Sequence, residues 1–282
     1  GTVETFVGNQ KVMWGRHSKK QARVLQIDGK NIRDLSQWFQ CIRSILFCPE
    51  DIDIVRGAPQ IRRNFVDRAK FVSSPDYLNI VRRYISVLEQ KRELLKKDAV
   101  KHEELAPWNT QMVDYGKKIT LARQEILREL DAPFQEMHQF IAGSEKVSLA
   151  LRGIASSEAE DVKDRLENLL EKVKSEEIRK RQSLVGPHRD DLDILINGVP
   201  ARKFASQGQT RSIVLALKLA ELEASHQRGQ SPLFLLDDLS SELDHGRLKK
   251  LVQMLSERDG QVWITTTNPN FLSSLPKSRM AR

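Results

Sequence analysis

The stretch SPLFLLDDLSSELD, residues 231–244, decides the fold of this chain. Its apolar run, residues 233–236, is typical of a strand buried on both faces of a parallel sheet. A second apolar run, residues 262–265, follows a helical pattern carried by Leu248, Leu251, Val252 and Leu255. Strand, helix and strand in this order form a parallel crossover unit. The sequence therefore predicts an α/β fold.

Two acids, Asp237 and Asp238, stand where the first of these strands ends. The carboxyl edge of an open α/β sheet is where ligands bind. In nucleotide hydrolases the first such acid holds Mg²⁺ through water, and the second polarises the attacking water. An apolar strand followed by two acids is more often a strand with a solvated turn, so the pair alone does not establish a site.

Upstream of this strand, Ser206-Gln207-Gly208-Gln209 precedes a Leu- and Ala-rich helical stretch that extends to about Gln227. A glycine lets the backbone approach a ligand closely, and the first N–H groups of a helix attract anions. Ser206 adds a hydroxyl donor. Taken alone, the tetrapeptide is a capped helix start.

The middle of the chain has helical spacing. One apolar series consists of Tyr77, Val81, Tyr84, Leu88 and Leu95, with Lys91 at a skipped position. After Pro107 a second series follows, Trp108, Met112, Tyr115, Ile119, Ala122 and Ile126, at the spacing of a coiled-coil seam. We expect an antiparallel helical arm with its turn at the proline. The alternative is a three-helix bundle packed on the body.

Short apolar runs and turns fill residues 1–60, and Asp28-Gly29 and Asn197-Gly198 are both hairpin-turn signals. The composition, 39% hydrophobic and 30% charged residues, is that of a globular protein. No apolar run of membrane-spanning length and no leader pattern is present, so we expect a cytoplasmic protein. The net charge of +8 is compatible with a nucleic-acid partner and is weak evidence for one. Cys41 and Cys48 are too few for a zinc site, and we expect reduced, buried thiols.

The order of these segments resembles the ABC-type ATPases, in which Ser206–Gln209 corresponds to the signature and Ser241-Glu242-Leu243-Asp244 to the loop that crosses the dimer interface. Other blocks resemble the RecF family in particular, and the resemblance covers essentially the whole chain. These blocks are Gly186–Asp191, Phe47–Asp51 with Pro59, Arg62-Arg63 and Asp67, Gln90–Leu95, and Trp108 with Tyr115-Gly116.

The resemblance implies an ABC-ATPase-type head, with a P-loop NTPase sheet and its helices, plus a helical, coiled-coil-like arm. Residues 1–73 and 232–282 would form an incomplete ATPase lobe, and residues 74–231 the arm and the lobe that bears the signature. Ser206, Gln207, Gly208 and Gln209 would meet the γ-phosphate of nucleotide bound to a second copy. Ser241 and Asp244 would lie at the interface between the copies.

By the same resemblance, Asp237 would serve Mg²⁺ through water, and Asp238 would take the place of the catalytic glutamate. Thr266 or Thr267 falls where many ABC proteins have a histidine that senses the γ-phosphate. His188, within Gly186–Asp191, invites a catalytic interpretation, but a hydrogen-bonded turn histidine is the preferred one.

The motif G-x-x-x-x-G-K-[ST], whose amides and lysine hold phosphates, does not occur in the sequence. The family carries it upstream of the first strands seen here. We therefore expect ATP and Mg²⁺ to bind only when that loop is supplied, and this chain alone to be inactive although the family is a weak ATPase.

The function that the resemblance implies is recombinational DNA repair. An ATP-bound homodimer would clamp duplex DNA near single-stranded gaps and cooperate with recombination mediators such as RecR. The alternatives are an SMC-like structural DNA-binding head and a transporter's nucleotide-binding subunit. The short arm disfavours the first, and the presence of an arm disfavours the second.

Overall fold

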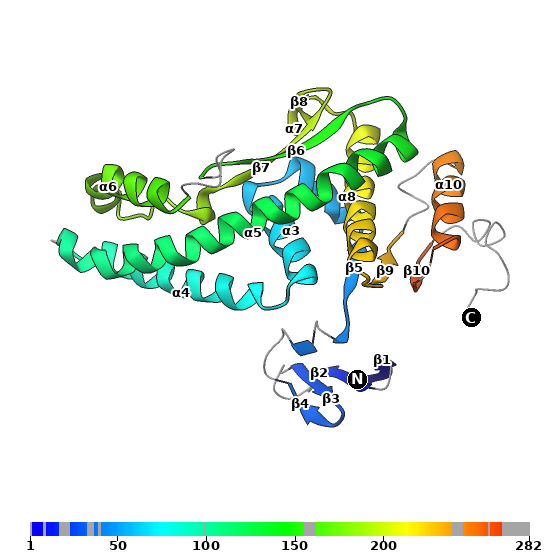
Figure 1. Cartoon of the computed structure of the whole chain (residues 1–282), viewed down its shortest axis with the longest axis horizontal. Helices are drawn as coiled ribbons and strands as arrows, with labels where there is room; N and C mark the ends of the chain where they lie inside the picture. The colour runs from blue at the N-terminus through cyan, green and yellow to red at the C-terminus, as the bar shows by residue number, and fades with distance from the viewer. Residues whose placement is uncertain are drawn as a thin grey trace.

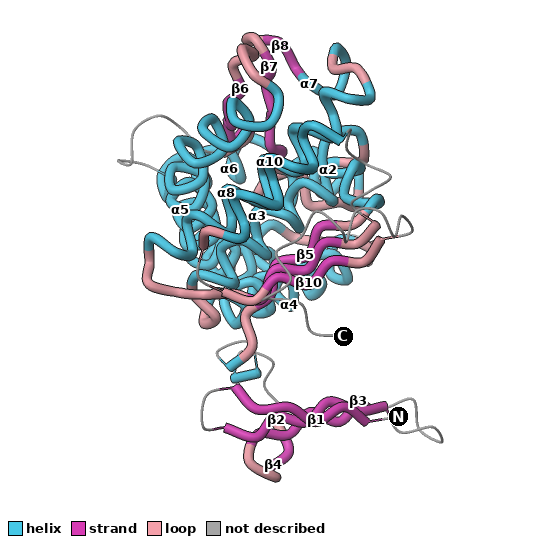
Figure 2. The backbone as a smooth tube through the Cα atoms, turned by 90° about the vertical axis from the view of Figure 1, so that its right-hand side faces the viewer, coloured by secondary structure: helices cyan, strands magenta, loops and turns pink. Residues whose placement is uncertain are grey.

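The computed structural model describes residues 2–7, 10–16, 23–32, 37–38, 41–98, 100–154, 162–238, 245–258 and 260–266. The N-terminal strands form an antiparallel sheet in the order β1-β2-β3-β4, which lies apart from the rest of the molecule (Figures 1 and 2). Its strands are β1 (Thr2–Val7), β2 (Gln10–Arg16), β3 (Arg23–Ile27) and β4 (Lys30–Asn31). The predicted turn at Asp28-Gly29 connects β3 and β4. Both residues have positive φ, 50° and 77°, as a two-residue hairpin turn requires.

The predicted parallel unit forms the second sheet, with the order β10-β9-β5. Its strands are β5 (Ser44–Phe47), β9 (Leu233–Leu236) and β10 (Val262–Ile264), and α10 (His245–Ser256) lies between the last two in the chain. Both pairings are parallel, so the three carboxyl ends meet at one edge of the sheet. The strand predicted over 262–265 ends one residue earlier than expected.

One hydrophobic core joins this sheet to the helices beside it. The apolar side chains of β5 and β9, such as Ile45 and Phe234, are buried in the same cluster as the middle of α8 (Gln207–Gln227). Shorter elements cover the cluster: η1 (Pro49–Ile52), α2 (Asp53–Arg56) and α3 (Pro59–Ser73). The apolar run that suggested a doubly buried strand is therefore buried on the face toward α8.

The opposite face of the sheet is open. Trp263 and Leu46 lie on either side of Leu235 in register, and their exposed fractions are 63% and 39%. Parallel sheets normally carry helices on both faces. This face consequently presents a row of apolar side chains that no described element covers.

The helical arm consists of three helices (Figure 1). α4 (Tyr77–Leu95) and α5 (His102–Ala142) form the expected hairpin, and α6 (Val162–Lys180) packs along α5. The second half of α5 enters the main core through residues such as Leu130 and Phe134. The structure thus combines the predicted hairpin with a feature of its alternative, because a third helix packs against it.

The expected turn at Pro107 is wrong. The connection lies at residues 96–101, and α5 begins at His102 with Pro107 in its second turn. The Glu104 carboxylate accepts a hydrogen bond from the Lys101 amide at 3.1 Å, which caps the helix ahead of the proline. Pro107 has no N–H, so α5 lacks one hydrogen bond to the Glu103 carbonyl, and the helix continues past it all the same.

A third sheet, β6-β7-β8, lies across α5 on the side that carries α7 (Figure 1). Its strands are β6 (Val147–Arg152), β7 (Asp191–Ile196) and β8 (Val199–Pro200), followed by α7 (Ala201–Phe204), with η3 (Pro187–Arg189) ahead of β7. The predicted Asn197-Gly198 turn joins β7 to β8, with φ angles of 49° and 79°. This sheet leads the chain directly into the start of α8.

Candidate functional site

The Ser206–Gln209 turn is held by a reciprocal cap at the start of α8. The Gln209 amide donates to Ser206 Oγ at 3.2 Å, and the Ser206 amide donates to Gln209 Oε1 at 2.7 Å. Gln209 Nε2 also donates to the Glu145 carboxylate at 2.5 Å, which ties the turn to the connection between α5 and β6. A capping box of this kind satisfies two of the backbone donors that a helix start leaves free. The turn is therefore rigid before any ligand arrives.

Gly208 lies in open space within this turn. A Cβ built on it would meet no atom within 4 Å, so the packing of this chain does not require a glycine here. The cap uses the N–H groups of Ser206 and Gln209, and it leaves those of the exposed residues Gln207 and Gly208 for a ligand. N–H groups at a helix start form a ready anion site. The absence of a side chain would let a phosphate or a second protein surface approach the backbone closely.

Side chains of two neighbouring helices brace the start of α8. The Arg56 guanidinium from α2 donates to Thr210 Oγ1 and to the Ala205 carbonyl, both at 3.3 Å. Arg247 from α10 donates to Ser212 Oγ at 2.9 Å. These contacts connect the Ser206–Gln209 turn to helices that flank the parallel sheet.

The second predicted cluster lies at the carboxyl edge of that sheet. Thr265 follows β10, and its hydroxyl donates to Asp237 Oδ1 at 2.5 Å while it accepts from the Asp238 amide at 3.0 Å. The Asp237 amide donates to the Phe47 carbonyl at 2.9 Å. Asp238 has a left-handed backbone, φ 46°, an uncommon conformation for a residue other than glycine. The edge thus places two carboxylates and a hydroxyl together.

Thr265 was missed by the sequence analysis, which selected Thr266 or Thr267 as the sensor. A prediction that β10 ends at Ile264 would have identified Thr265. The first residue after a parallel strand lies at the carboxyl edge of the sheet, where Asp237 also lies. Thr266 is half-buried and follows it. Thr267, together with Ser241 and Asp244 of the expected interface loop, lies outside the described residues.

We expect Thr265→Val to loosen this edge. The change removes the donor to Asp237 and the acceptor for the Asp238 amide, and it keeps the side-chain shape. The free energy of unfolding should fall by about 1 kcal/mol, the net contribution of such hydrogen bonds. Urea unfolding measures the loss, and Thr110→Val on the exposed side of α5 is the control. Equal stability of the two variants would contradict the hydroxyl bridge.

A buried lysine connects α8 to the Phe47–Asp51 block. Lys218 is fully buried, and its ammonium donates to Asp51 Oδ1 at 2.8 Å. Asp51 Oδ2 in turn accepts from the Cys48 amide at 2.9 Å. Burial, and then the charge of Asp51, raises the pKa of the Cys48 thiol to about 11, so this cysteine is a protonated packing residue. Both Cys41 and Cys48 are free thiols, as expected, but they are half-buried rather than buried.

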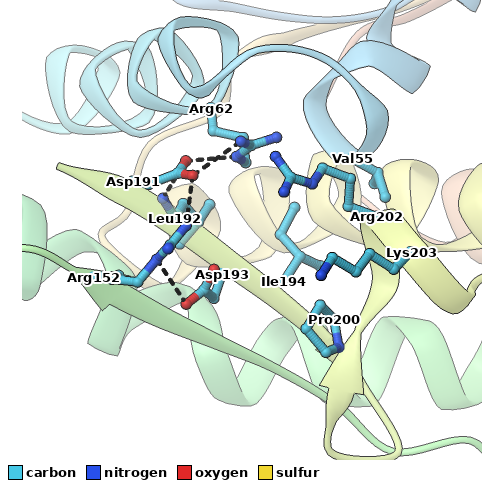
Figure 3. Close-up of a pocket in the computed structure, with 10 residues that line it drawn as sticks. All are labelled: Val55, Arg62, Arg152, Asp191, Leu192, Asp193, Ile194, Pro200, Arg202 and Lys203. Carbon is cyan, nitrogen blue, oxygen red and sulfur yellow. Dashed lines mark hydrogen bonds and ion pairs between the residues drawn. The ribbon is translucent and has the colours of Figure 1, made fainter. Parts of the chain in front are cut away.

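The Gly186–Asp191 block is a junction between helices and sheet. Arg62 from α3 donates two hydrogen bonds to the Asp191 carboxylate (Figure 3). Its Nε lies 2.6 Å from Oδ1, and its Nη2 lies 3.0 Å from Oδ2. Arg152 from β6 contacts the same carboxylate at 3.0 Å. Burial raises the pKa of Asp191, but Arg62 and then Arg152 outweigh it, so the net pKa is lowered. This ion network lines a pocket of about 210 Å³ beside α7.

His188 is part of the same junction. The Tyr84 hydroxyl and His188 Nδ1 are 2.7 Å apart, and burial followed by the cations Arg189 and Arg92 lowers the pKa of His188 to about 3. A Cβ on Gly186 would lie 2.2 Å from the Tyr84 hydroxyl, which explains the glycine. His188 is consequently a neutral, hydrogen-bonded turn residue near pH 7, as the preferred interpretation predicted.

The two clusters do not meet within one chain. Ser206 stands between α7 and α8, whereas Asp237 directly follows β9. In Figure 1, α7 lies at the top of the view and β9 lies by the lower end of α8. The hydrogen bonds between Ser206 and Gln209 and between Asp237 and Thr265 each lie within one cluster. Within the same part of the chain, no group of three His, Cys, Asp or Glu side chains could hold a metal ion, and no helix has the length and hydropathy to cross a membrane.

Comparison with known proteins gives one consistent family. No protein-family model matches the chain. The chain is 38% identical over 253 residues to the DNA replication and repair protein RecF of Geotalea daltonii, covering 88% of this chain and 69% of that protein. It is 34% identical to RecF of Streptococcus pneumoniae over 92% of this chain and 72% of that one.

Solved structures agree. The recombination mediator protein RecF-ATPrS in the RecFOR pathway matches with a TM-score of 0.83 and 27% identity, over 97% of this chain and 74% of that one. An SmcHead bound to the C-winged helix domain of ScpA matches with a TM-score of 0.52 and 10% identity, over 97% and 67%, which supports the head fold alone. The α/β head with a helical arm is thereby confirmed. The chain belongs to the RecF family of DNA replication and repair proteins.

Proposed function

We propose that this chain is the signature-bearing part of a RecF-type ATP-dependent DNA-repair head that dimerises around nucleotide. The observation that carries the proposal is the rigid, open helix start at Ser206–Gln209, which lies away from Asp237 and Asp238 of its own chain. A phosphate-binding turn that cannot reach its own carboxylates is suited to meet nucleotide on a second copy. The related RecF structures with ATP and ATPrS support nucleotide as the ligand.

In this arrangement Ser206, Gly208 and Gln209 would contact the γ-phosphate of nucleotide on the partner, and Gln207 would belong to the same nucleotide-binding turn. Asp237 would hold Mg²⁺ through water, and Asp238 would act on the attacking water. The cluster fits a magnesium ion, because carboxylate oxygens at the carboxyl edge of a parallel sheet are the ligands that Mg²⁺ prefers. Bound ATP–Mg²⁺ supplies the energy of head closure.

Thr265 is the additional residue that the structure brings to this site, since its hydroxyl already holds Asp237 in place. We propose that Thr265 positions Asp237 and that Thr266 or Thr267 senses the γ-phosphate. Ser241 and Asp244 complete the interface between copies.

We further propose the division into two lobes, residues 1–73 with 232–282 and residues 74–231. The pairing of β5 with β9 supports it, because that pairing brings the two ends of the first lobe into one sheet. The open row of Leu46, Leu235 and Trp263 supports the expectation that a further segment, with the phosphate-binding loop, packs on this face.

At the level of the cell, we propose recombinational repair: duplex DNA bound near single-stranded gaps, with mediators such as RecR as partners. The RecFOR pathway of the structural relatives and the net charge of +8 support this role. An SMC-like structural head is the alternative. The short α4, of 19 residues, argues against it, because a ring requires a much longer coiled coil.

We expect the 282-residue chain alone neither to bind nor to hydrolyse ATP measurably, because the loop that anchors the phosphates is missing from its sequence. Binding of a fluorescent ATP analogue, followed by anisotropy, measures this directly. Fusion to the N-terminal segment of the Geotalea daltonii relative should restore binding, and Asp237→Asn should then weaken it in the presence of Mg²⁺. A clear ATPase rate of the unfused chain would contradict the account of the site.

A further inference from the structure

A large basic cleft lies in the angle between α3, α4 and α5, closed at one end by residues 181–189. Its volume is about 820 Å³, and it is separate from the Ser206 turn and from the edge of the parallel sheet. Its lining includes three carboxylates and twice as many cations. The cations are Arg63, Arg92, Lys96, Arg123, Arg181 and Arg189.

The floor of the cleft is apolar. Val81, Ile85 and Leu88 of α4 line it at intervals of four and three residues, which places them on one helix face. Ile85 is 46% exposed, although it is a large aliphatic residue beside the packed seam of α4 and α5. The coiled-coil series of α4 does not include Ile85, so its exposure is not explained by the packing of the arm.

Part of the positive charge at the rim is not neutralised within the chain. Arg123 is bound to Asp67, at 2.8 Å, and Lys96 to Glu93, at 2.6 Å. Arg92 is exposed and has no ion-pair partner among the described residues, and Arg189 donates only to the Ser183 carbonyl, at 2.8 Å. Their charges act on the neighbouring His188, whose ring is kept neutral. The cleft therefore has an excess of positive charge above an apolar floor.

We propose that this cleft binds an acidic, partly apolar segment of a partner protein. Carboxylates of the segment pair with Arg92 and Arg189, and one of its aliphatic side chains covers Ile85. Arginine forks match carboxylates bidentately, and a buried apolar anchor within a polar rim is the usual anatomy of a protein–protein contact. The proposal does not depend on nucleotide-driven dimerisation.

The lining favours a peptide over nucleic acid. Single-stranded nucleic acid binds where bases stack on exposed aromatic side chains. The one aromatic residue of this lining is Tyr84, which is 2% exposed and engaged with His188. The Ile85 strip gives no contact to a phosphate backbone, whereas a leucine or valine of a peptide would bury it.

The test uses the 282-residue chain and a fluorescein-labelled helical peptide of about 14 residues built from Glu and Leu, read by fluorescence anisotropy at low salt. We expect Arg92→Glu/Arg189→Glu to weaken binding about tenfold or more, since each charge reversal replaces an attraction by a repulsion. Ile85→Ser should weaken it about threefold. Lys117→Glu, one charge reversal of the same kind at an exposed position of α5 outside the cleft, should leave binding within about twofold.

Circular dichroism of each variant verifies folding, and a Gln-for-Glu peptide tests the charge requirement. Three results would overturn the proposal: no binding of the acidic peptide by the unaltered chain, equal binding by the double variant and by Lys117→Glu, or equal binding of the Gln peptide. Preferential binding of a single-stranded or duplex oligonucleotide that is lost in the same double variant would also overturn it, by making the cleft a nucleic-acid site.

Discussion

Lys91→Met should lower the free energy of unfolding by about 3–5 kcal/mol, the loss expected when one partner of a buried ion pair is removed. Lys91 of α4 and Glu177 of α6 are both fully buried, with Nζ and Oε2 2.6 Å apart. Burial lowers the pKa of Lys91, and the charge of Glu177 opposes that shift. Without the lysine, the buried Glu177 carboxylate would keep only the Ser183 hydroxyl and the Leu184 amide as donors, so it would stay charged without a cation or take up a proton.

Urea unfolding followed by circular dichroism measures this loss. Lys91→Met/Glu177→Met should recover most of it, because the double variant buries no charge. The matched control is Lys96→Met, which breaks the exposed pair with Glu93 and should cost less than about 1 kcal/mol. If Lys91→Met is as stable as Lys96→Met, the Lys91–Glu177 pair does not hold α6 to α4.

Arg123→Met should cost a comparable 3–5 kcal/mol, because it leaves the half-buried Asp67 carboxylate without its cation and takes a cation from the buried Asp190. Arg123 of α5 donates to both oxygens of Asp67 at 2.8 Å and to the Pro187 carbonyl at 2.7 Å, and it lies 3.4 Å from Asp190. Burial raises the pKa of Asp190, and Arg123 opposes this rise. A single guanidinium thus joins α3, α5 and the Gly186–Asp191 block.

Thermal and urea unfolding measure the effect, and Arg128→Met on the exposed face of α5 provides the control, since Arg128 contacts only the Gln124 carbonyl. The loss should be accompanied by a still higher pKa of Asp190. Because this pKa already lies above its ordinary value, protonation of Asp190 on acidification should return part of the lost stability. Equal stability of the two variants would mean that the junction is held by packing alone.

Much of the fold follows from local patterns. The apolar run 233–236, the start of α8 and the two hairpin turns each depend on residues within a few positions, so their sequence predicts them. The skipped position at Lys91 was also informative. Burying the charge of a lysine at a seam position costs free energy unless an acid pairs with it. Here the acid is Glu177, which lies 86 residues further along the chain.

Features that depend on distant segments were harder to predict. The Pro107 turn was misplaced, because proline is tolerated near a helix start whose cap lies at Lys101 and Glu104. The pairing of Thr265 with Asp237 depends on the register between β9 and β10, which composition does not reveal. The basic cleft likewise forms only when α3, α4 and residues 181–189 meet, so its charges appear in the sequence as ordinary solvated helix faces.

The proposed contact of Ser206 with nucleotide can be tested separately from its capping of α8. Ser206→Asp keeps an oxygen that caps α8, whereas it places a negative charge where the partner's γ-phosphate would bind. Ser206→Arg fills the open space beside Gly208. Ser175→Arg, at an exposed position of α6, is the control for an added arginine.

The central claim, a nucleotide site shared between two copies, is tested most directly by light scattering of the chain fused to its relative's N-terminal segment, with and without ATP–Mg²⁺. We predict that the fused chain and its Ser175→Arg variant double in mass with ATP, and that Ser206→Asp and Ser206→Arg remain monomeric while still binding the nucleotide. Dimerisation of the Ser206 variants, or ATP-driven dimerisation of the unfused chain, would contradict the account.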